Sequence, residues 1–152
     1  KKDFTNINLH FLGKLQTNKV KFSIPLFDYI HSLDNIKLAE KIANEQLKKK
    51  FKPKIFIQVN IGKEKQKNGI DIENLEKFYT DCTKNFNLNI IGLMCLPPND
   101  GSSSIYFSEM QKLINNTNLK ELSMGMTDDY IEALKYKSTF LRIGSKIFGS
   151  RN

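Results

Sequence analysis

Two segments near the C-terminal end of the sequence carry residue types that can hold an anion. They are Leu122–Asp129 and Leu141–Gly149, and each is an apolar run that leads into a small or hydroxylated turn. A helix is expected to begin directly after each turn, so backbone N–H groups would point toward one common anion. Thr127 and Ser145 add a hydroxyl group to each turn. The residue types therefore predict half of a phosphate-binding pocket.

Glycines in both turns support this interpretation, because Gly125 and Gly144 would let the backbone approach an anion closely. Glycine and serine are also common in ordinary strand-to-helix connections, so either segment alone is a weak signal. The two segments follow the last two expected strands of the chain. Phosphate sites in (β/α) barrels commonly lie after the last two strands. We therefore favour the phosphate interpretation.

Arg142 is the most distinctive cationic residue, since the chain has two arginines beside 22 lysines. Arginine is a planar and permanently charged donor, which lysine cannot replace. Strand alternation places Arg142 on the side opposite to Leu141 and Ile143. It could donate a charged hydrogen bond to a ring nitrogen in the mouth of a barrel, or form a buried ion pair with Asp128 or Asp129. We favour the first interpretation.

The elements that must position these residues are short apolar runs that alternate with helical patterns. Strands are expected at 9–12, 28–33, 54–60, 89–95, 121–125 and 139–143, and helices at 34–50, 72–85, 105–115 and 128–135, with a last turn at 146–149. No helix is expected between the first two strands. Strict alternation of the later elements indicates a parallel sheet with right-handed crossovers. In such folds the strand ends carry the ligand-binding residues.

The first long helix shows the clearest pattern. Asp34 is its expected N-cap. Its apolar stripe consists of Ile36, Leu38, Ala39, Ile42, Ala43 and Leu47. A helical period of this kind indicates one face packed against the sheet.

Length, composition and charge limit the classes of function that the chain can have. A chain of 152 residues suits one domain, and no apolar run approaches the roughly 20 residues of a membrane span. The formal net charge of +8 would suit a nucleic-acid partner, but the lysines are scattered along the chain. We therefore expect no nucleic-acid partner and no membrane. Cys82 and Cys95 lack a metal or redox spacing, which favours two reduced thiols in a cytoplasmic protein.

Other polar or polarisable residues give weaker signals. His10 and His31 are each interpreted as core histidines with hydrogen-bond partners, and no cluster has the spacing of metal ligands. The basic loop Lys65–Gly69 could reach a phosphate or could lie in solvent, and the sequence does not decide between these. By position alone, Met94 and the Met124–Met126 strand end suit core packing better than cofactor contact.

Six segments in chain order resemble one known family, the pyridoxal phosphate homeostasis proteins. They are His10–Lys19, Ile57–Ile61, Lys67–Gly69, Gly92–Met94, Leu122–Asp129 and Arg142–Gly149. The resemblance implies an α/β fold, a (β/α)8 TIM-type barrel that binds pyridoxal 5'-phosphate (PLP) and is related to the N-terminal barrel of alanine racemase. It implies that residues 1–152 form a single domain that has about six of the eight strands and lacks the first two βα units.

The resemblance also implies roles for individual residues. Arg142 would lie near the pyridine nitrogen. The phosphate and ring would be surrounded by Ser123, Met124, Gly125, Met126, Thr127, Gly144 and Ser145, with Thr127, Gly144 and Ser145 binding the phosphate itself. The family's Schiff-base lysine lies on a strand before the segment that matches His10, and no lysine of this chain matches it. PLP is thus expected to be held without a covalent bond, or to be absent.

The function implied by the resemblance is that of a non-catalytic PLP carrier or regulator in the cytoplasm. PLP-dependent apoenzymes would be its candidate recipients, and the chain would be a monomer or weak dimer. An arginine at the ring nitrogen makes the ring a poor electron sink, which suits a carrier. Two alternatives stay open. A racemase-like PLP enzyme would need a lysine and a second base, and a basic RNA-binding module would bind with a steep salt dependence.

Overall fold

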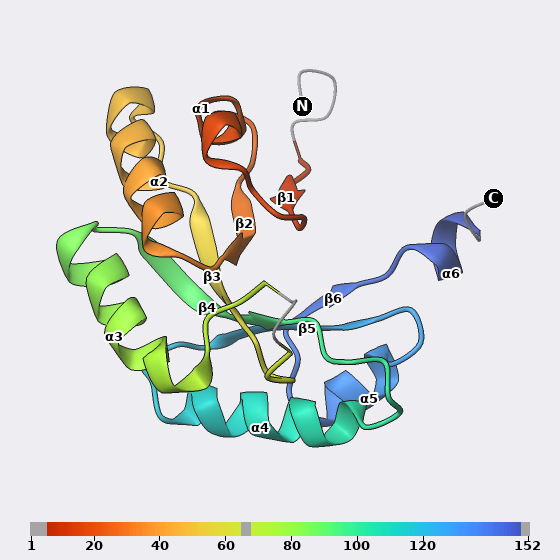
Figure 1. The fold of residues 1–152 in the computed structure, drawn as a ribbon. Coiled ribbons are helices and arrows are strands. Elements are labelled where there is room, and N and C mark those ends of the chain that lie inside the picture. Colours follow the sequence, from red (N-terminus) through yellow and green to blue (C-terminus); the bar gives the residue numbers. More distant parts are fainter. Residues whose placement is uncertain (1–5, 65–67, 150–152) are drawn as a thin grey trace.

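The computed structural model describes residues 6–64 and 68–149, and its centre is one curled sheet (Figure 1). Six parallel strands pair in chain order: β1 (His10–Phe11), β2 (Tyr29–Leu33), β3 (Lys54–Val59), β4 (Asn89–Cys95), β5 (Glu121–Met126) and β6 (Phe140–Arg142). Because the order is sequential and the sheet curls, the carboxyl ends of all six strands meet on one rim. The six-stranded half-barrel predicted from the sequence is confirmed.

Helices follow the strands. They are α1 (Val20–Ser23), α2 (Ile36–Lys49), α3 (Leu75–Thr80), α4 (Ser103–Asn115), α5 (Tyr130–Lys135) and α6 (Ser145–Phe148). Of these, α1 to α5 cover the outer face of the sheet, whereas α6 lies beyond the end of β6 (Figure 1). A 3-10 turn, Ile72–Asn74, leads into α3, and a π-helical turn, Asp81–Asn85, continues it. Among the described residues, none of the helices has the length and apolarity to cross a lipid bilayer.

The first connection corrects one expectation. A 3-10 turn, Thr17–Lys19, and α1 lie between β1 and β2, where no helix was expected. The helix α1 has only four residues, and it buries Val20 and Ser23 beside the fully buried Ile24. One turn is too short to display the 3.6-residue period by which helices are recognised in a sequence.

The outer face of the sheet is apolar and packs against the helices. Alternate residues of β3, namely Ile55, Ile57 and Val59, are almost completely buried there. They belong to one cluster with Ile42 of α2 and Phe107 of α4. Burial of this apolar surface is the main force that holds the helices on the sheet.

The helix α2 confirms the expected position of the helix but not its details. Its N-cap is Asn35, whose Oδ1 accepts a hydrogen bond from the Leu38 amide at 2.9 Å, whereas Asp34 accepts one from the Asn35 side chain. Leu38 is buried, but Ile36 and Leu47 are 41% and 74% exposed. The predicted apolar stripe therefore faces the sheet only in its central part.

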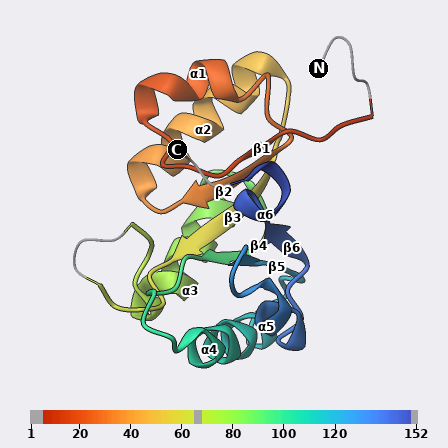
Figure 2. The ribbon, with the colours of Figure 1, turned by 90° about the vertical axis from the view of Figure 1, so that its right-hand side faces the viewer.

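The inner face of the sheet has a different composition. Phe56 and Met94 are buried there, outside the helix-side cluster. The rings of His31 and Phe56 stack with centroids 4.3 Å apart, and Phe140 packs edge-on against Phe56 at 5.1 Å. Figure 2 shows the molecule from this open side, with α6 in front of the strands. Aromatic and polar side chains thus fill the half-barrel.

Candidate functional site

A pocket of about 630 Å³ lies at the carboxyl ends of β5 and β6. It is lined by both segments that were singled out in the sequence: Met126, Thr127, Asp128, Arg142, Gly144, Ser145, Phe148 and Gly149. The two segments meet because β5 and β6 are neighbours in the sheet, with Met126 in register with Arg142. The predicted meeting of the two turns at one site is therefore present in the structure.

The hydroxyl groups of the two turns point at each other. Ser145 Oγ and Thr127 Oγ1 are 3.1 Å apart and form an exposed hydrogen bond. Gly144 lies beside them, and apart from Gly144 and its two chain neighbours no heavy atom lies within 4 Å of the position that a Cβ would take there. Hydroxyl donors beside open backbone form a cradle that suits a phosphate group.

Arg142 lies at the inner wall of this pocket and is held by two hydrogen bonds. Its Nη1 donates to Ser123 Oγ at 2.7 Å, and its Nη2 donates to the carbonyl oxygen of Cys95 at 2.8 Å. Burial lowers the pKa of the guanidinium group from its ordinary value. Among the described residues, Arg142 forms no ion pair with Asp128 or Asp129, the alternative that was not favoured, and Asp129 accepts a hydrogen bond from the Met126 amide at 2.6 Å. The ion-pair interpretation is therefore wrong.

The two histidines continue the network into the half-barrel. His31 Nδ1 lies 2.9 Å from Ser123 Oγ, and His31 Nε2 lies 2.9 Å from His10 Nδ1. Burial lowers the pKa of His31 to about 3, with smaller contributions from the neighbouring His10 and Arg142. Burial also lowers the pKa of His10, against an opposing effect of Asp28. Both histidines are hydrogen-bonded, as expected, but only His31 lies in the core, whereas His10 is partly exposed.

The link between these histidines and Arg142 was not expected. His31 and Ser123 are 92 residues apart in the sequence, and their contact depends on how β2 and β5 face each other across the curled sheet. A usable signal was nevertheless present, because both are polar residues in strands whose apolar residues belong to the core. Such residues require a partner when they are buried.

Two residues of the predicted site have other surroundings than expected. The Met124 side chain is completely buried in the helix-side cluster, so it faces away from the pocket. Gly125 has a φ of +92°, and a Cβ there would lie 2.6 Å from the Ala133 side chain of α5. Helix packing by itself therefore accounts for a glycine at this position. Met126, by contrast, is 41% exposed and lines the pocket.

Neither cysteine thiol contributes to this site. Cys82 and Cys95 are free and buried, and burial raises the pKa of each thiol to about 12. Residues 65–67, which include the lysines of the predicted basic loop, lie outside the described residues. Within the described part of the chain, no group of three or more His, Cys, Asp and Glu side chains could hold a metal ion.

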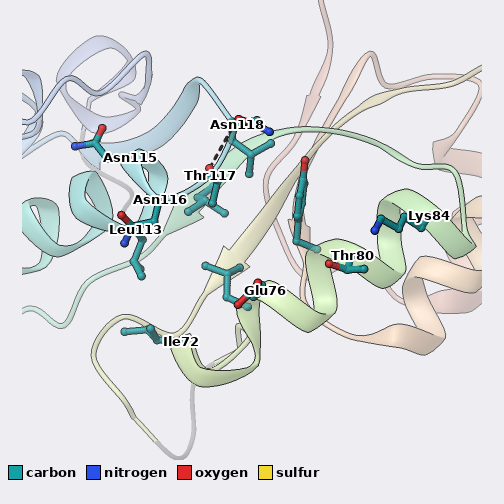
Figure 3. A pocket seen from close by; sticks show the side chains of 13 residues that line it. Ile72, Glu76, Thr80, Lys84, Leu113, Asn115, Asn116, Thr117 and Asn118 are labelled. Carbon is teal, nitrogen blue, oxygen red and sulfur yellow. Dashed lines mark hydrogen bonds between the residues drawn. The ribbon is translucent and has the colours of Figure 1, made fainter.

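A second pocket, of about 570 Å³, lies on the outer side of the sheet (Figure 3). Glu76 and Thr80 of α3 line one wall, and Leu113 and Thr117 line the other. Thr117 belongs to the loop that precedes β5, so this pocket lies near the amino end of that strand. It shares no lining residue with the first pocket, and ligand sites of (β/α) barrels lie at the opposite end.

Comparison with known proteins identifies relatives of the whole chain. Residues 7–152 match the family model of the alanine racemase N-terminal domain. The chain is 36% identical to the pyridoxal phosphate homeostasis protein of Aquifex aeolicus and 34% identical to that of Haemophilus influenzae. These matches cover 96% and 97% of this chain. The chain spans 68% and 66% of those two relatives, or about two thirds of their length.

Solved structures give the same result. PipY of Synechococcus elongatus PCC7942, in a structure with PLP bound, superposes with a TM-score of 0.86 at 30% identity, covering 97% of this chain and 73% of PipY. An alanine racemase of Clostridium difficile shares the fold, with a TM-score of 0.72 at 13% identity, and covers 99% of this chain and 41% of the racemase. By sequence and by fold, the chain belongs to the pyridoxal phosphate homeostasis protein family.

Proposed function

We propose that this chain binds PLP in the pocket at the ends of β5 and β6 and takes part in PLP homeostasis without turning over a substrate. The observation that carries the proposal is the convergence of the Thr127 and Ser145 hydroxyls, the open backbone at Gly144 and the Arg142 guanidinium around one pocket. The names of the relatives and the PLP-bound structure of PipY support it.

The residues present fit the cofactor. Thr127, Gly144 and Ser145 would hold the phosphate, whose negative charge suits hydroxyl and backbone donors. Arg142 would lie at the pyridine nitrogen, where a permanent cation opposes protonation of that nitrogen. Ser123 would hold Arg142 in place, and Met126 would line the rim. Bound PLP would supply an aldehyde that reacts with amines.

We further propose that the six strands are the last six of an eight-stranded barrel. β1 and β6 are the edge strands of this sheet, and the chain covers 73% of PipY. The family's covalent anchor would then belong to a segment that precedes His10. The contacts that this chain itself makes to PLP would be non-covalent. As a cytoplasmic carrier, it would work as a monomer or weak dimer that passes PLP to apoenzymes.

The test is equilibrium dialysis of the purified chain against PLP. A double variant, Thr127→Val with Ser145→Ala, removes the two hydroxyls of the cradle. Its matched control, Thr80→Val with Ser108→Ala, removes the same atoms from the helix-covered outer face. We expect PLP to bind the wild type and the control equally, and the cradle variant at least about tenfold more weakly. Equal binding by all three proteins would contradict the proposed site.

Absence of turnover needs a separate measurement. The PLP-loaded chain is incubated with L-alanine in D2O, and exchange of the α-proton is followed by NMR. We expect no exchange above that of free PLP. Exchange that depends on the protein would instead favour a racemase-like enzyme.

A further inference from the structure

We propose that His31 is a positioning residue for Arg142, acting through Ser123 as the middle of a hydrogen-bond chain that runs in one direction from Arg142 to His10. The proposal rests on the proposed function, because Arg142 is the group assigned to the pyridine nitrogen. Nothing in the sequence pattern alone assigns such a role to His31.

The direction of the chain follows from the chemistry of its first members. Arginine can only donate, so Ser123 Oγ accepts from Arg142 Nη1 at 2.7 Å. The single hydroxyl proton of Ser123 is then free to point at His31 Nδ1, 2.9 Å away. Were His31 Nδ1 the donor instead, Ser123 Oγ would accept twice and its buried hydroxyl proton would lose this acceptor. A buried donor without a partner is costly, which favours the first direction.

The same reasoning assigns the tautomers of the two imidazole rings. With Nδ1 as acceptor, the neutral His31 ring carries its proton on Nε2 and donates it to His10 Nδ1, 2.9 Å away. His10 then carries its own proton on Nε2. Both rings are neutral in this arrangement. A proton added to either ring would reverse the donor and acceptor of at least one hydrogen bond between Ser123, His31 and His10. The depressed pKa of both histidines agrees with this requirement.

The surroundings of the rings hold this arrangement. His31 is 1% exposed and stacks on Phe56, and Phe140 packs against both rings. His10 stacks on Tyr29 at 4.2 Å, and Tyr29 accepts a hydrogen bond from Lys54 Nζ at 3.0 Å. The charged groups near the pair are Arg142 on the side of His31, and Asp28 and Lys54 on the side of His10.

The first test reads the protons directly and does not require PLP. The chain has two histidines, so a ¹⁵N-histidine NMR spectrum contains two rings, and the His31→Asn variant assigns both. We expect both rings to be neutral at pH 7 with the proton on Nε2. A His31 ring that carries its proton on Nδ1, or that is charged at pH 7, would overturn the proposal.

The second test uses two substitutions of matched polarity. Asparagine places its side-chain oxygen about where Nδ1 of histidine lies, so His31→Asn keeps an acceptor for Ser123 and loses the contact with His10. Glutamine reaches about to the Nε2 position, so His31→Gln keeps the contact with His10 and loses that with Ser123. We expect His31→Asn to keep the PLP affinity within about threefold, and His31→Gln to weaken it about tenfold.

Equal loss in both variants would show that His31 acts only through packing. Should His31→Gln not fold, Ser123→Ala interrupts the hydrogen-bond chain at its centre. The same tenfold loss of PLP affinity is then expected, and the ¹⁵N signals should show that neither imidazole ring keeps a single tautomer. If the wild type does not bind PLP, the proposed function fails, but the NMR measurement still decides the direction of the hydrogen-bond chain.

Discussion

The two faces of the same sheet are built in different ways. In β5, Leu122 and Met124 face the helices and lie in the apolar cluster, whereas Ser123 between them faces the inside of the half-barrel. The outer face needs only apolar side chains of suitable volume, because the hydrophobic effect is non-directional. The inner face depends on individual hydrogen bonds with a definite direction. We therefore expect the outer face to supply most of the stability at neutral pH, and the inner face to carry the proposed binding site.

This difference separates the expected effects of substitutions. Loss of an apolar side chain on the outer face should lower the free energy of unfolding and leave the affinity for PLP of the folded molecules unchanged. Loss of a polar group on the inner face should lower the affinity for PLP and change the free energy of unfolding only slightly. One neutral hydrogen bond contributes only about 1 kcal/mol net to stability.

The largest effect on stability is expected at Phe107, which is completely buried between α4 and the sheet. Phe107→Ala leaves a cavity and should lower the free energy of unfolding by about 3–5 kcal/mol. Urea unfolding measures the loss. Equilibrium dialysis against PLP, well below the urea midpoint of unfolding, should give the wild-type affinity. A lower PLP affinity of the folded variant would contradict the proposed difference between the two faces.

A matched pair of glycines sharpens the comparison further. Gly125→Ala puts a Cβ 2.6 Å from Ala133 at a φ of +92°, so it should cost about 1–3 kcal/mol of stability. Gly144→Ala meets no atom within 4 Å and should leave stability almost unchanged. It should nevertheless weaken PLP binding, because its methyl group occupies the cradle. Thermal melting and dialysis of both variants test this, and a stable Gly125→Ala protein would contradict it.

Acid should destabilise the protein through the inner face. The pKa of His31 is about 3 in the folded protein against an ordinary 6.5, so only the unfolded chain takes up this proton between those values. The free energy of unfolding should therefore fall by up to about 1.4 kcal/mol per pH unit below pH 6.5. The same carboxylates are present in His31→Asn, so the difference between the two pH curves reports on His31 together with its coupling to His10. Parallel pH curves would disprove the assignment.

The smallest effect is expected at the start of α2. Asn35→Ala removes the N-cap hydrogen bond to Leu38 and should cost about 1 kcal/mol. Asp34→Ala removes no hydrogen bond to the helix backbone and should cost less. Urea unfolding of both variants compares them, and the reverse order would restore Asp34 as the cap.

The outer face was the more predictable from the sequence. Each expected strand is present, because alternating or continuous apolar runs report directly on burial. Errors arose where the signal was short or ambiguous. The helix α1 has a single turn, and Asp34 and Asn35 are adjacent residues that can both cap a helix.

The inner face was predicted only in part. The residue types of the two C-terminal turns identified the pocket, and alternation placed Arg142 on the correct side. The contacts of His31 with Ser123 and His10 depend on the curl of the sheet, which no local pattern contains. The packing of Gly125 against Ala133 was missed for a related reason, because the two residues meet only when α5 docks on the sheet.

The most direct test of the central claim compares three ligands on the unmodified chain. PLP, pyridoxal and inorganic phosphate differ only in which part of the cofactor they carry. If the turns after β5 and β6 hold the phosphate, PLP should bind at least about tenfold more tightly than pyridoxal, and inorganic phosphate should displace it. Equal binding of PLP and pyridoxal, with no competition by phosphate, would contradict the account.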